Sequence, residues 1–274
     1  MEYDPALYAS SAPHYLRGRP PYSAELVGVL TRELGLDRTG VLLDVGCGPG
    51  VLTVQLAPAF DTAIGLDPEQ RMLEEAARHA KETGAQNVRW VNAPAEAIAG
   101  LDLPRPRTVT FGQSFHWTDR LPVAEAVFDL LEPGGAVAMI THDIDARPAP
   151  IEPPAPPIPH DEIRTVVRRY LGDDPLAGRG RLPRTGERYE QTLARTRFGP
   201  PRLVHAPGRT DIRRTADDVV SGYLSMSYAA PDLFGADLSA FVADVHEVLR
   251  RASPDGIFWD WPGDTAILIA TKPA

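Results

Sequence analysis

The chain of 274 residues has a single cysteine, Cys47, so it forms neither an intramolecular disulfide nor a metal site that needs several cysteines. It also lacks any apolar run near the roughly 20 residues that a membrane-spanning helix requires. Its first residues contain neither an apolar signal core nor a basic leader. We therefore expect a soluble, cytoplasmic protein without a membrane partner.

Positive charge is scarce as well. The chain has 28 basic and 37 acidic residues, a formal net charge of −9, and its only lysines are Lys81 and Lys272. A protein that grips the phosphate backbone without regard to sequence needs an excess of basic side chains. The composition therefore argues against a nucleic-acid partner.

The sequence between residues 23 and 141 alternates between two patterns. Short apolar runs typical of buried strands occur at 40–46, 62–67, 87–93, 108–114 and 136–142. Apolar residues at helical spacing, with capping and stop signals, predict helices at 23–36, 50–58, 68–84 and 121–135. Strands separated by single helices form right-handed parallel crossovers. The order predicts an α/β fold with a doubly wound, mostly parallel, Rossmann-like sheet of seven strands.

A proline-rich stretch, residues 147–160, interrupts this alternation. It is either a spacer or a docking motif for a partner's aromatic groove. Near the end of the chain, strands at 256–261 and 265–272 flank a short turn, so we expect them to pair antiparallel as the last strands of the sheet. We expect five segments along the chain: an N-terminal lid (1–22), a Rossmann-like core (23–146), a linker (147–160), an inserted α-rich substrate cap (161–235) and the end of the core (236–274).

The loop after the first strand is rich in glycine. Asp44 ends the strand, and Gly46, Gly48 and Gly50 follow at G-x-G-x-G spacing, whereas dinucleotide-binding dehydrogenases use G-x-G-x-x-G. In a doubly wound sheet, ligands bind beyond the carboxyl ends of the strands, beside strand one. Asp67, at the end of the second strand, can accept from both hydroxyls of a ribose. The pattern favours a nucleoside without phosphates and disfavours a nicotinamide-dependent oxidoreductase.

These segments resemble the class I S-adenosylmethionine-dependent methyltransferases. The matching stretches are "LLDVGCGPG", "GLDPEQRML", "NVRWVNAPAEAI", "TFGQSFHW" and "LLEPGG". They are most similar to the small-molecule branch, which includes quinone-biosynthesis and trans-aconitate methyltransferase-like enzymes. The resemblance covers residues 23–141 and the closing "DTAILIATKP". It implies S-adenosylmethionine as cofactor, S-adenosylhomocysteine as product, and a small-molecule acceptor.

The resemblance also implies which residues bind the cofactor. Gly46 and Gly48 would line its methionine end, Asp67 would hold the ribose and Met72 would pack near the adenine. The family usually has an acid where this chain has Pro94, so Glu96, a backbone carbonyl, or stacking together with the Ala95 amide must replace it. The expected cofactor-binding residues are Asp44, Gly46, Gly48, Asp67, Pro68, Met72, Ala95, Glu96 and Gln113. Cys47 is expected to be a small packing residue, because methyl transfer needs no nucleophile from the enzyme.

Two histidines follow strand ends on the side where the acceptor is expected. His116 and Trp117 lie in "FGQSFHWTD" after the fourth strand, and His142 follows the fifth. His116 is predicted to be the general base or to orient the acceptor, or else it only holds the loop. His142 is the second candidate for the catalytic role.

The N-terminal arm carries aromatic side chains at Tyr3, Tyr8, Tyr15 and Tyr22, together with His14. A helix would place Tyr8 and Tyr15 on one face. The arm is predicted to close over cofactor and acceptor as an aromatic lid, the alternative being that its tyrosines merely anchor it. The expected acceptor-binding residues are Tyr8, His14, Tyr15, Tyr22, His116, Trp117 and Tyr223.

Taken together, these patterns favour a small-molecule methyltransferase of bacterial secondary metabolism, such as antibiotic biosynthesis, acting on oxygen, nitrogen or carbon. The alternative is a non-methylating catalyst or binding module that keeps the cofactor fold. A protein or nucleic-acid methyltransferase is disfavoured by the acidic charge. A homo-oligomer is left open.

Overall fold

The computed structural model of the chain describes residues 8–146, 152–173 and 186–274. Its main sheet has seven strands: Val41–Val45 (β1), Thr62–Asp67 (β2), Val88–Asn92 (β3), Thr108–Gly112 (β4), Ala136–Asp143 (β5), Arg202–Ala206 (β6) and Asp264–Thr271 (β9). Two further strands, Arg213–Thr215 (β7) and Ile257–Trp259 (β8), form a small separate sheet. The α-helices are Ala12–Gly18 (α1), Leu26–Leu34 (α2), Val51–Leu56 (α3), Gln70–Thr83 (α4), Arg120–Leu130 (α5), His160–Leu171 (α6), Tyr189–Leu193 (α7), Ala216–Leu224 (α8), Pro231–Phe234 (α9) and Leu238–Ala252 (α10). Within the described residues, none of these helices has the length and apolar character needed to span a bilayer.

The strand order in the main sheet is β3-β2-β1-β4-β5-β9-β6. The first five strands are parallel, and β9 runs antiparallel to both of its neighbours. This confirms the predicted doubly wound, mostly parallel seven-stranded sheet with an antiparallel last strand. Because the order reverses beside β1, the loops that follow β1 and β4 diverge to opposite faces and leave a crevice at their carboxyl ends.

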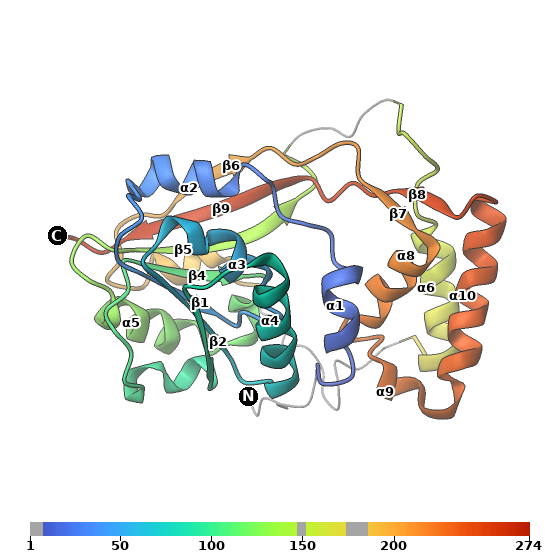
Figure 1. Ribbon diagram of the computed structural model, residues 1–274, viewed down its shortest axis with the longest axis horizontal. Helices are drawn as coiled ribbons and strands as arrows, with labels where there is room; N and C mark the ends of the chain where they lie inside the picture. The colour runs from blue at the N-terminus through green and yellow to red at the C-terminus, as the bar shows by residue number, and fades with distance from the viewer. Residues whose placement is uncertain (1–7, 147–151, 174–185) are drawn as a thin grey trace.

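Helices cover both faces of the sheet (Figure 1). One apolar cluster packs beneath α5 and includes Phe111 and Phe115, and a second packs beneath α2 and α3 and includes Leu26 and Leu56. The central strands are buried on both faces, which explains their continuous apolar runs. Helix α2, expected at 23–36, ends at Gly35 in the left-handed conformation. Ser23, the first residue of the expected range, lies before the helix, where its hydroxyl accepts from the Glu25 amide at 3.0 Å and donates to the carbonyl of Pro207.

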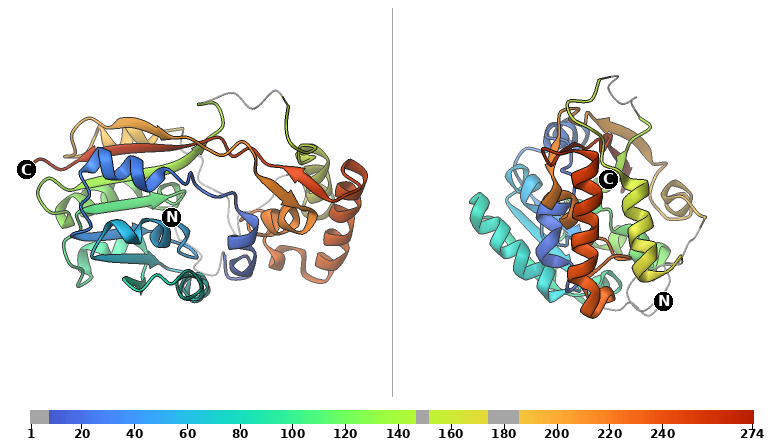
Figure 2. Two further views of the ribbon diagram at one scale, coloured as in Figure 1. Left: turned by 45° about the horizontal axis from the view of Figure 1, so that its top comes forward. Right: turned by 90° about the vertical axis from the view of Figure 1, so that its right-hand side faces the viewer.

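The pairing expected for the last two strands is wrong. β8 pairs antiparallel with β7 in the small sheet, and the chain then passes from β8 into β9 of the main sheet (Figure 2, left). The edge strand beside β9 is β6, a segment that the sequence pattern assigns to the cap. The turn at 262–264 thus joins two sheets rather than two strands of one hairpin. A short apolar run followed by Pro-Gly predicts a strand and a turn but does not identify the strand's partner.

A third apolar cluster lies outside the sheet and is shared by α6, α8 and α10, which stand side by side (Figures 1 and 2). We call this unit, together with β7 and β8, the cap. Helix α10, expected to belong to the core, contributes Phe241 and Val245 to this cluster instead. Of the proline-rich stretch, residues 152–160 are described, and Pro157 there forms an isolated bridge to Trp259. Helix α1 lies between α4 of the core and α8 of the cap.

Candidate active site

A cavity of about 580 Å³ opens at the carboxyl ends of the parallel strands. This volume is typical of a small-molecule site. Three parts of the molecule line it: the loops after β1, β2, β3, β4 and β5, the N-terminal arm, and the loop that follows α8. Of the residues predicted from sequence, those that line it are Tyr8, Tyr15, Tyr22, Asp44, Gly46, Gly48, Asp67, Pro68, Met72, Ala95, Glu96, Gln113, His116, Trp117 and His142. His14 and Tyr223 do not.

The glycines after β1 have different physical roles. Gly46, Gly48 and Gly50 all have positive φ, which strains any other L-residue. A Cβ on Gly46 would come within 2.5 Å of the Ser114 Cβ, and one on Gly50 would come within 2.6 Å of the Trp90 ring. Packing against these neighbouring side chains therefore requires glycine at both positions. A Cβ on Gly48 would meet nothing within 4 Å. Packing therefore does not explain Gly48, and its open side faces the cavity.

Asp67 lies beside this loop at the end of β2. Its Oδ2 accepts from the Gly48 amide at 2.8 Å and its Oδ1 accepts from the Glu69 amide at 2.9 Å. Burial, which two backbone hydrogen bonds only partly offset, raises the pKa of Asp67 to about 6. Each oxygen keeps a second lone pair for a ligand hydroxyl. Asp67 thus couples the glycine loop to a position where a diol can bind.

Asp44 is fully buried beneath the loop. Its two oxygens accept from the hydroxyls of Thr53 at 2.6 Å and Thr110 at 2.8 Å, which ties β1 to α3 and to β4. Burial, opposed by these two hydrogen bonds, raises the pKa of Asp44 to about 6. Its described contacts support the loop, and direct contact with a cofactor stays a prediction.

The region expected to hold an adenine follows β2 and β3. Met72 and Ala95 are buried and line the cavity, and the exposed Pro94 lines it as well. Glu96 is exposed, and its Oε1 accepts from the Asp119 amide at 2.9 Å, so one of its oxygens already holds the segment before α5. Because Glu96 already holds the Asp119 amide, the contacts favour the Ala95 backbone and the apolar wall of Met72 over Glu96 as the groups that would bind the adenine in place of the family's acid.

Polar side chains gather after β4 and β5. Gln113 has φ +55°, a left-handed conformation that non-glycine residues rarely adopt and that is concentrated at functional sites. The His116 Nδ1 lies 3.2 Å from the Tyr189 hydroxyl. The Nδ1 of His142 is buried without a partner among the described residues. Burial and nearby arginines lower the pKa of both histidines to about 4, so both are neutral at pH 7.

The arm supplies aromatic walls to the same cavity. The Tyr8 ring meets Trp117 edge-on with centroids 5.7 Å apart, and the Tyr22 ring stacks on His142 at 5.0 Å. Tyr15 lines the cavity from α1. Tyr223 lies in the apolar cluster of the cap and its hydroxyl bonds the Nδ1 of His160 at 2.9 Å, so its neighbours are the cap's own. Tyr3 lies outside the described residues.

Sequence reasoning missed Arg19. It is the only lysine or arginine among the described residues that line the cavity. Among the described residues its side chain has one hydrogen bond, from Nη2 to the Ser225 carbonyl at 2.9 Å, and no carboxylate within ion-pair distance. The signal was present in the sequence, because "RGRPPY" places two arginines between Tyr15 and Tyr22 of the arm. The prediction for the arm rested on its aromatic residues and His14 alone.

Comparisons with known proteins identify the family to which part of the chain is similar. Residues 42–135 match a family model described as "Methyltransferase domain". The chain is 28% identical to a 2-heptyl-1-hydroxyquinolin-4(1H)-one methyltransferase of Mycobacteroides abscessus, over 67% of this chain and 82% of that protein. It is 35% identical to a ubiquinone biosynthesis O-methyltransferase of Leptothrix cholodnii, over 36% of this chain and 43% of that protein.

Several other curated relatives also match this chain over less than half of their own length. Among solved structures, the [4+2]-cyclase SpnF superposes with a TM-score of 0.52 at 17% identity, covering 98% of this chain and 94% of that one. That likeness concerns the fold alone. By the family model and the relatives, residues 42–135 form a methyltransferase domain of the S-adenosylmethionine-dependent class, and the cofactor of that class is S-adenosylmethionine.

Proposed function

From the methyltransferase domain that residues 42–135 form, we propose that the protein transfers the methyl group of S-adenosylmethionine to a small-molecule acceptor. One observation carries the proposal. A single cavity of about 580 Å³ runs past Asp67 and Gly48 to His116 and to the aromatic residues of the arm, so that a nucleoside and an acceptor can share it. Bound there, the cofactor supplies an electrophilic methyl group on a sulfonium.

The residues of the cavity fit this cofactor. Asp67 offers free lone pairs to the ribose hydroxyls, and Gly48 leaves open space where the backbone must be approached closely. Met72 and Ala95 form the wall for the adenine. Arg19, the only described strong cation of the wall, is the partner that we propose for the carboxylate of the methionine moiety.

The acceptor end is aromatic and contains groups that accept protons. Methyl transfer is a direct displacement, so alignment in a dry pocket supplies most of the acceleration. Tyr8, Tyr22 and Trp117 provide flat faces for a planar acceptor. His116 and His142 are both neutral, so each can accept a proton from an acceptor hydroxyl as the methyl group arrives; because a pKa near 4 makes them weak bases, the acceptor hydroxyl that they suit is an acidic one. We propose His116 as the base and His142 as the second candidate.

We further propose that the acceptor is a ring carrying an acidic hydroxyl, and that the protein acts in bacterial secondary metabolism. The flat aromatic walls and the neutral histidines support an O-methyl transfer. Two similar proteins, a hydroxyquinolone methyltransferase and a ubiquinone biosynthesis O-methyltransferase, are named for acceptors of this kind.

The proposal is tested in two steps. Calorimetry should show that the purified protein binds S-adenosylhomocysteine and not NAD. Incubation with methyl-labelled S-adenosylmethionine and a panel of phenols, hydroxyquinolones and aliphatic acids should then label a ring hydroxyl, read by mass spectrometry. Binding of S-adenosylhomocysteine without transfer to any acceptor class would favour a non-methylating catalyst, and no binding at all would refute the proposal.

A further inference from the structure

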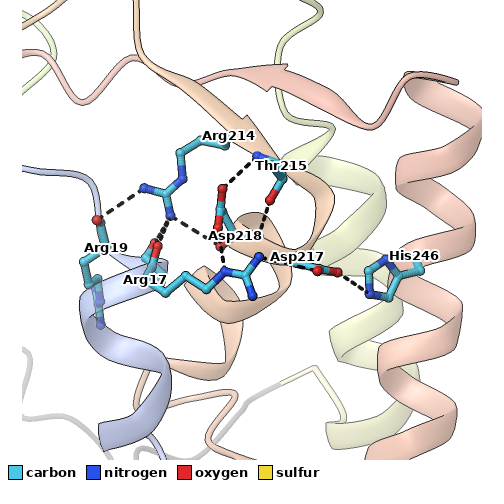
Figure 3. Close-up of polar contacts among 8 residues, drawn as sticks. Arg17, Arg19, Arg214, Thr215, Asp217, Asp218 and His246 are labelled. Atoms are coloured by element: carbon cyan, nitrogen blue, oxygen red, sulfur yellow. Dashed lines mark hydrogen bonds and ion pairs between the residues drawn. The ribbon is translucent and has the colours of Figure 1, made fainter. Parts of the chain in front are cut away.

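Arg214 of β7 holds the end of the arm's helix (Figure 3). The residue is 7% exposed. Its Nη2 donates to the carbonyl oxygens of Arg17 and Gly18, each at 2.7 Å, and its Nη1 donates to that of Arg19 at 3.3 Å. These carbonyls end α1 and have no partner within that helix. A helix of 7 residues is marginal by itself, so the buried guanidinium acts as its C-terminal cap.

Arg19 makes the reciprocal contact from the arm to the cap. Its Nη2 donates to the carbonyl of Ser225, the residue that caps the C-terminus of α8. The same guanidinium lies over the Tyr15 ring, 4.8 Å from the centroid, and lines the cavity. Its Nε is buried without a partner among the described residues. A cation that is anchored at one nitrogen and unpaired at another is ready to receive an anionic ligand.

The backbones of α1 and α8 also touch directly. A Cβ on Gly18 would lie 2.4 Å from the Ser221 carbonyl group, so no larger residue fits there. Arg17 pairs with Asp218 at 2.6 Å and with Asp217 at 3.4 Å, which extends the contact along α8 (Figure 3). The arm is therefore fastened to the cap and is not a free lid. The residues after α8 that line the cavity follow directly from this junction, at 226–228.

We propose that Arg214 is a positioning residue for the cofactor. By capping α1 it holds Arg19 where the guanidinium receives the cofactor's carboxylate. The Arg19 guanidinium also bonds the Ser225 carbonyl, and it thereby connects the carboxylate of the cofactor to residues 226–228, which line the part of the cavity proposed for the acceptor. The adenosine moiety is then bound by the core, and the amino-acid moiety by the junction of arm and cap. This inference rests on the proposed function.

A pair of ligands separates the two moieties. S-Adenosylhomocysteine and 5′-methylthioadenosine share the adenosine and the sulfur, but only the first has the amino acid. In calorimetry, Arg214→Gln should weaken the binding of S-adenosylhomocysteine about tenfold or more, the effect of losing a charged hydrogen bond. It should change the binding of 5′-methylthioadenosine less than about threefold. Arg213→Gln, an exposed neighbour on the same strand, is the matched control and should leave both affinities unchanged.

A double-mutant cycle shows whether Arg214 acts through Arg19. Arg19→Gln should cause the same selective loss, and adding Arg214→Gln to it should weaken S-adenosylhomocysteine by less than about twofold more. In wild type, S-adenosylhomocysteine but not 5′-methylthioadenosine should slow amide hydrogen exchange at 223–228, and Arg214→Gln should abolish that protection. Losses that add, or that affect both ligands equally, would mean that Arg214 only stabilises the fold and would overturn the inference.

A second variant and the ligand affinities of the wild-type protein separate a failure of folding from a failure of the inference. If Arg214→Gln does not fold, Arg214→Lys, which keeps the charge but cannot donate to several carbonyls of α1 at once, must show the selective loss instead. An equal loss, or none, in that variant would overturn the inference. Wild-type protein that binds neither ligand would refute the proposed function. Wild-type protein that binds both, with neither affinity changed in Arg214→Gln, would refute only the role of Arg214.

Discussion

The affinity for S-adenosylhomocysteine should fall as the pH drops from 7 to 5, because Asp67 must be ionised to accept from a ribose diol. Burial raises the pKa of Asp67 to about 6. With that value about ten-elevenths of the carboxyl groups are ionised at pH 7 and about one-eleventh at pH 5, which weakens binding by about 1.4 kcal/mol. The apparent dissociation constant should therefore rise about tenfold.

Groups other than Asp67 contribute little to the change in ligand affinity between pH 5 and 7. The ligand's carboxylate stays ionised and its amine stays protonated between pH 5 and 7. His116 and His142, with pKa values near 4, stay neutral. Asp44 titrates near pH 6 as well, but both of its oxygens accept from threonine hydroxyls and it makes no contact that a ribose could replace. Its protonation affects the stability of the loop more than the contact with the ligand.

Calorimetry at pH 5, 6 and 7 and constant ionic strength measures the effect, with Asp67→Asn as the control. The variant should bind about 1.5–3 kcal/mol more weakly at pH 7, the range for a hydrogen bond to a charged group, and should lose most of the pH dependence. An affinity that is flat from pH 5 to 7 in wild type would refute the assignment of the ribose to Asp67. An unchanged slope in Asp67→Asn would assign the titration to another group.

Three more predictions follow from the site. Gly48→Val should abolish measurable binding of S-adenosylhomocysteine and cost about 1–2 kcal/mol of stability for the left-handed backbone, whereas Gly46→Ala, which meets a neighbouring side chain, should mainly lower the melting temperature. His116→Ala should lower turnover about 10²–10⁴-fold with cofactor affinity nearly intact; rescue by asparagine would indicate positioning, and a loss under threefold would exclude a catalytic role. Thr53→Val should lower the free energy of unfolding by about 1.5–3 kcal/mol at pH 8, because Asp44 loses a partner while ionised; urea unfolding should show a smaller loss at pH 5, and equal losses would contradict this.

The pH dependence of the stability loss in Thr53→Val follows from the proton linkage of Asp44. The pKa of Asp44 is raised in the folded state above its unfolded value near 4. Between about pH 4 and 6 the native protein therefore binds more protons than the unfolded chain, and the free energy of unfolding falls as the pH rises through that window. Thr53→Val removes a hydrogen bond that favours the ionised form. Its effect is consequently largest where Asp44 is ionised.

The features that were predictable from sequence are those set by neighbours along the chain. The run from β1 through the glycine loop to Asp67 is such a case, because Gly46, Gly48 and Asp67 are ordered by a strand, a turn and the next parallel strand. Its pattern of apolar residues, glycines and an acid at a strand end reports the backbone and the face that each residue occupies. The gathering of these residues in one cavity follows from the topology.

The features that were missed are set by partners far along the chain. β8 is only 3 residues long, and nothing within Ile257–Trp259 indicates that it pairs with β7 rather than with β9. Arg214 lies 195 residues from Arg19, whose carbonyl it binds. A buried guanidinium that donates only to backbone carbonyls needs no particular side chain at the other end, so no residue type marks its partner. This is why the sequence could predict that tyrosines of the arm border the site, whereas the attachment of the arm to the cap, which decides whether the arm moves alone, required the structure.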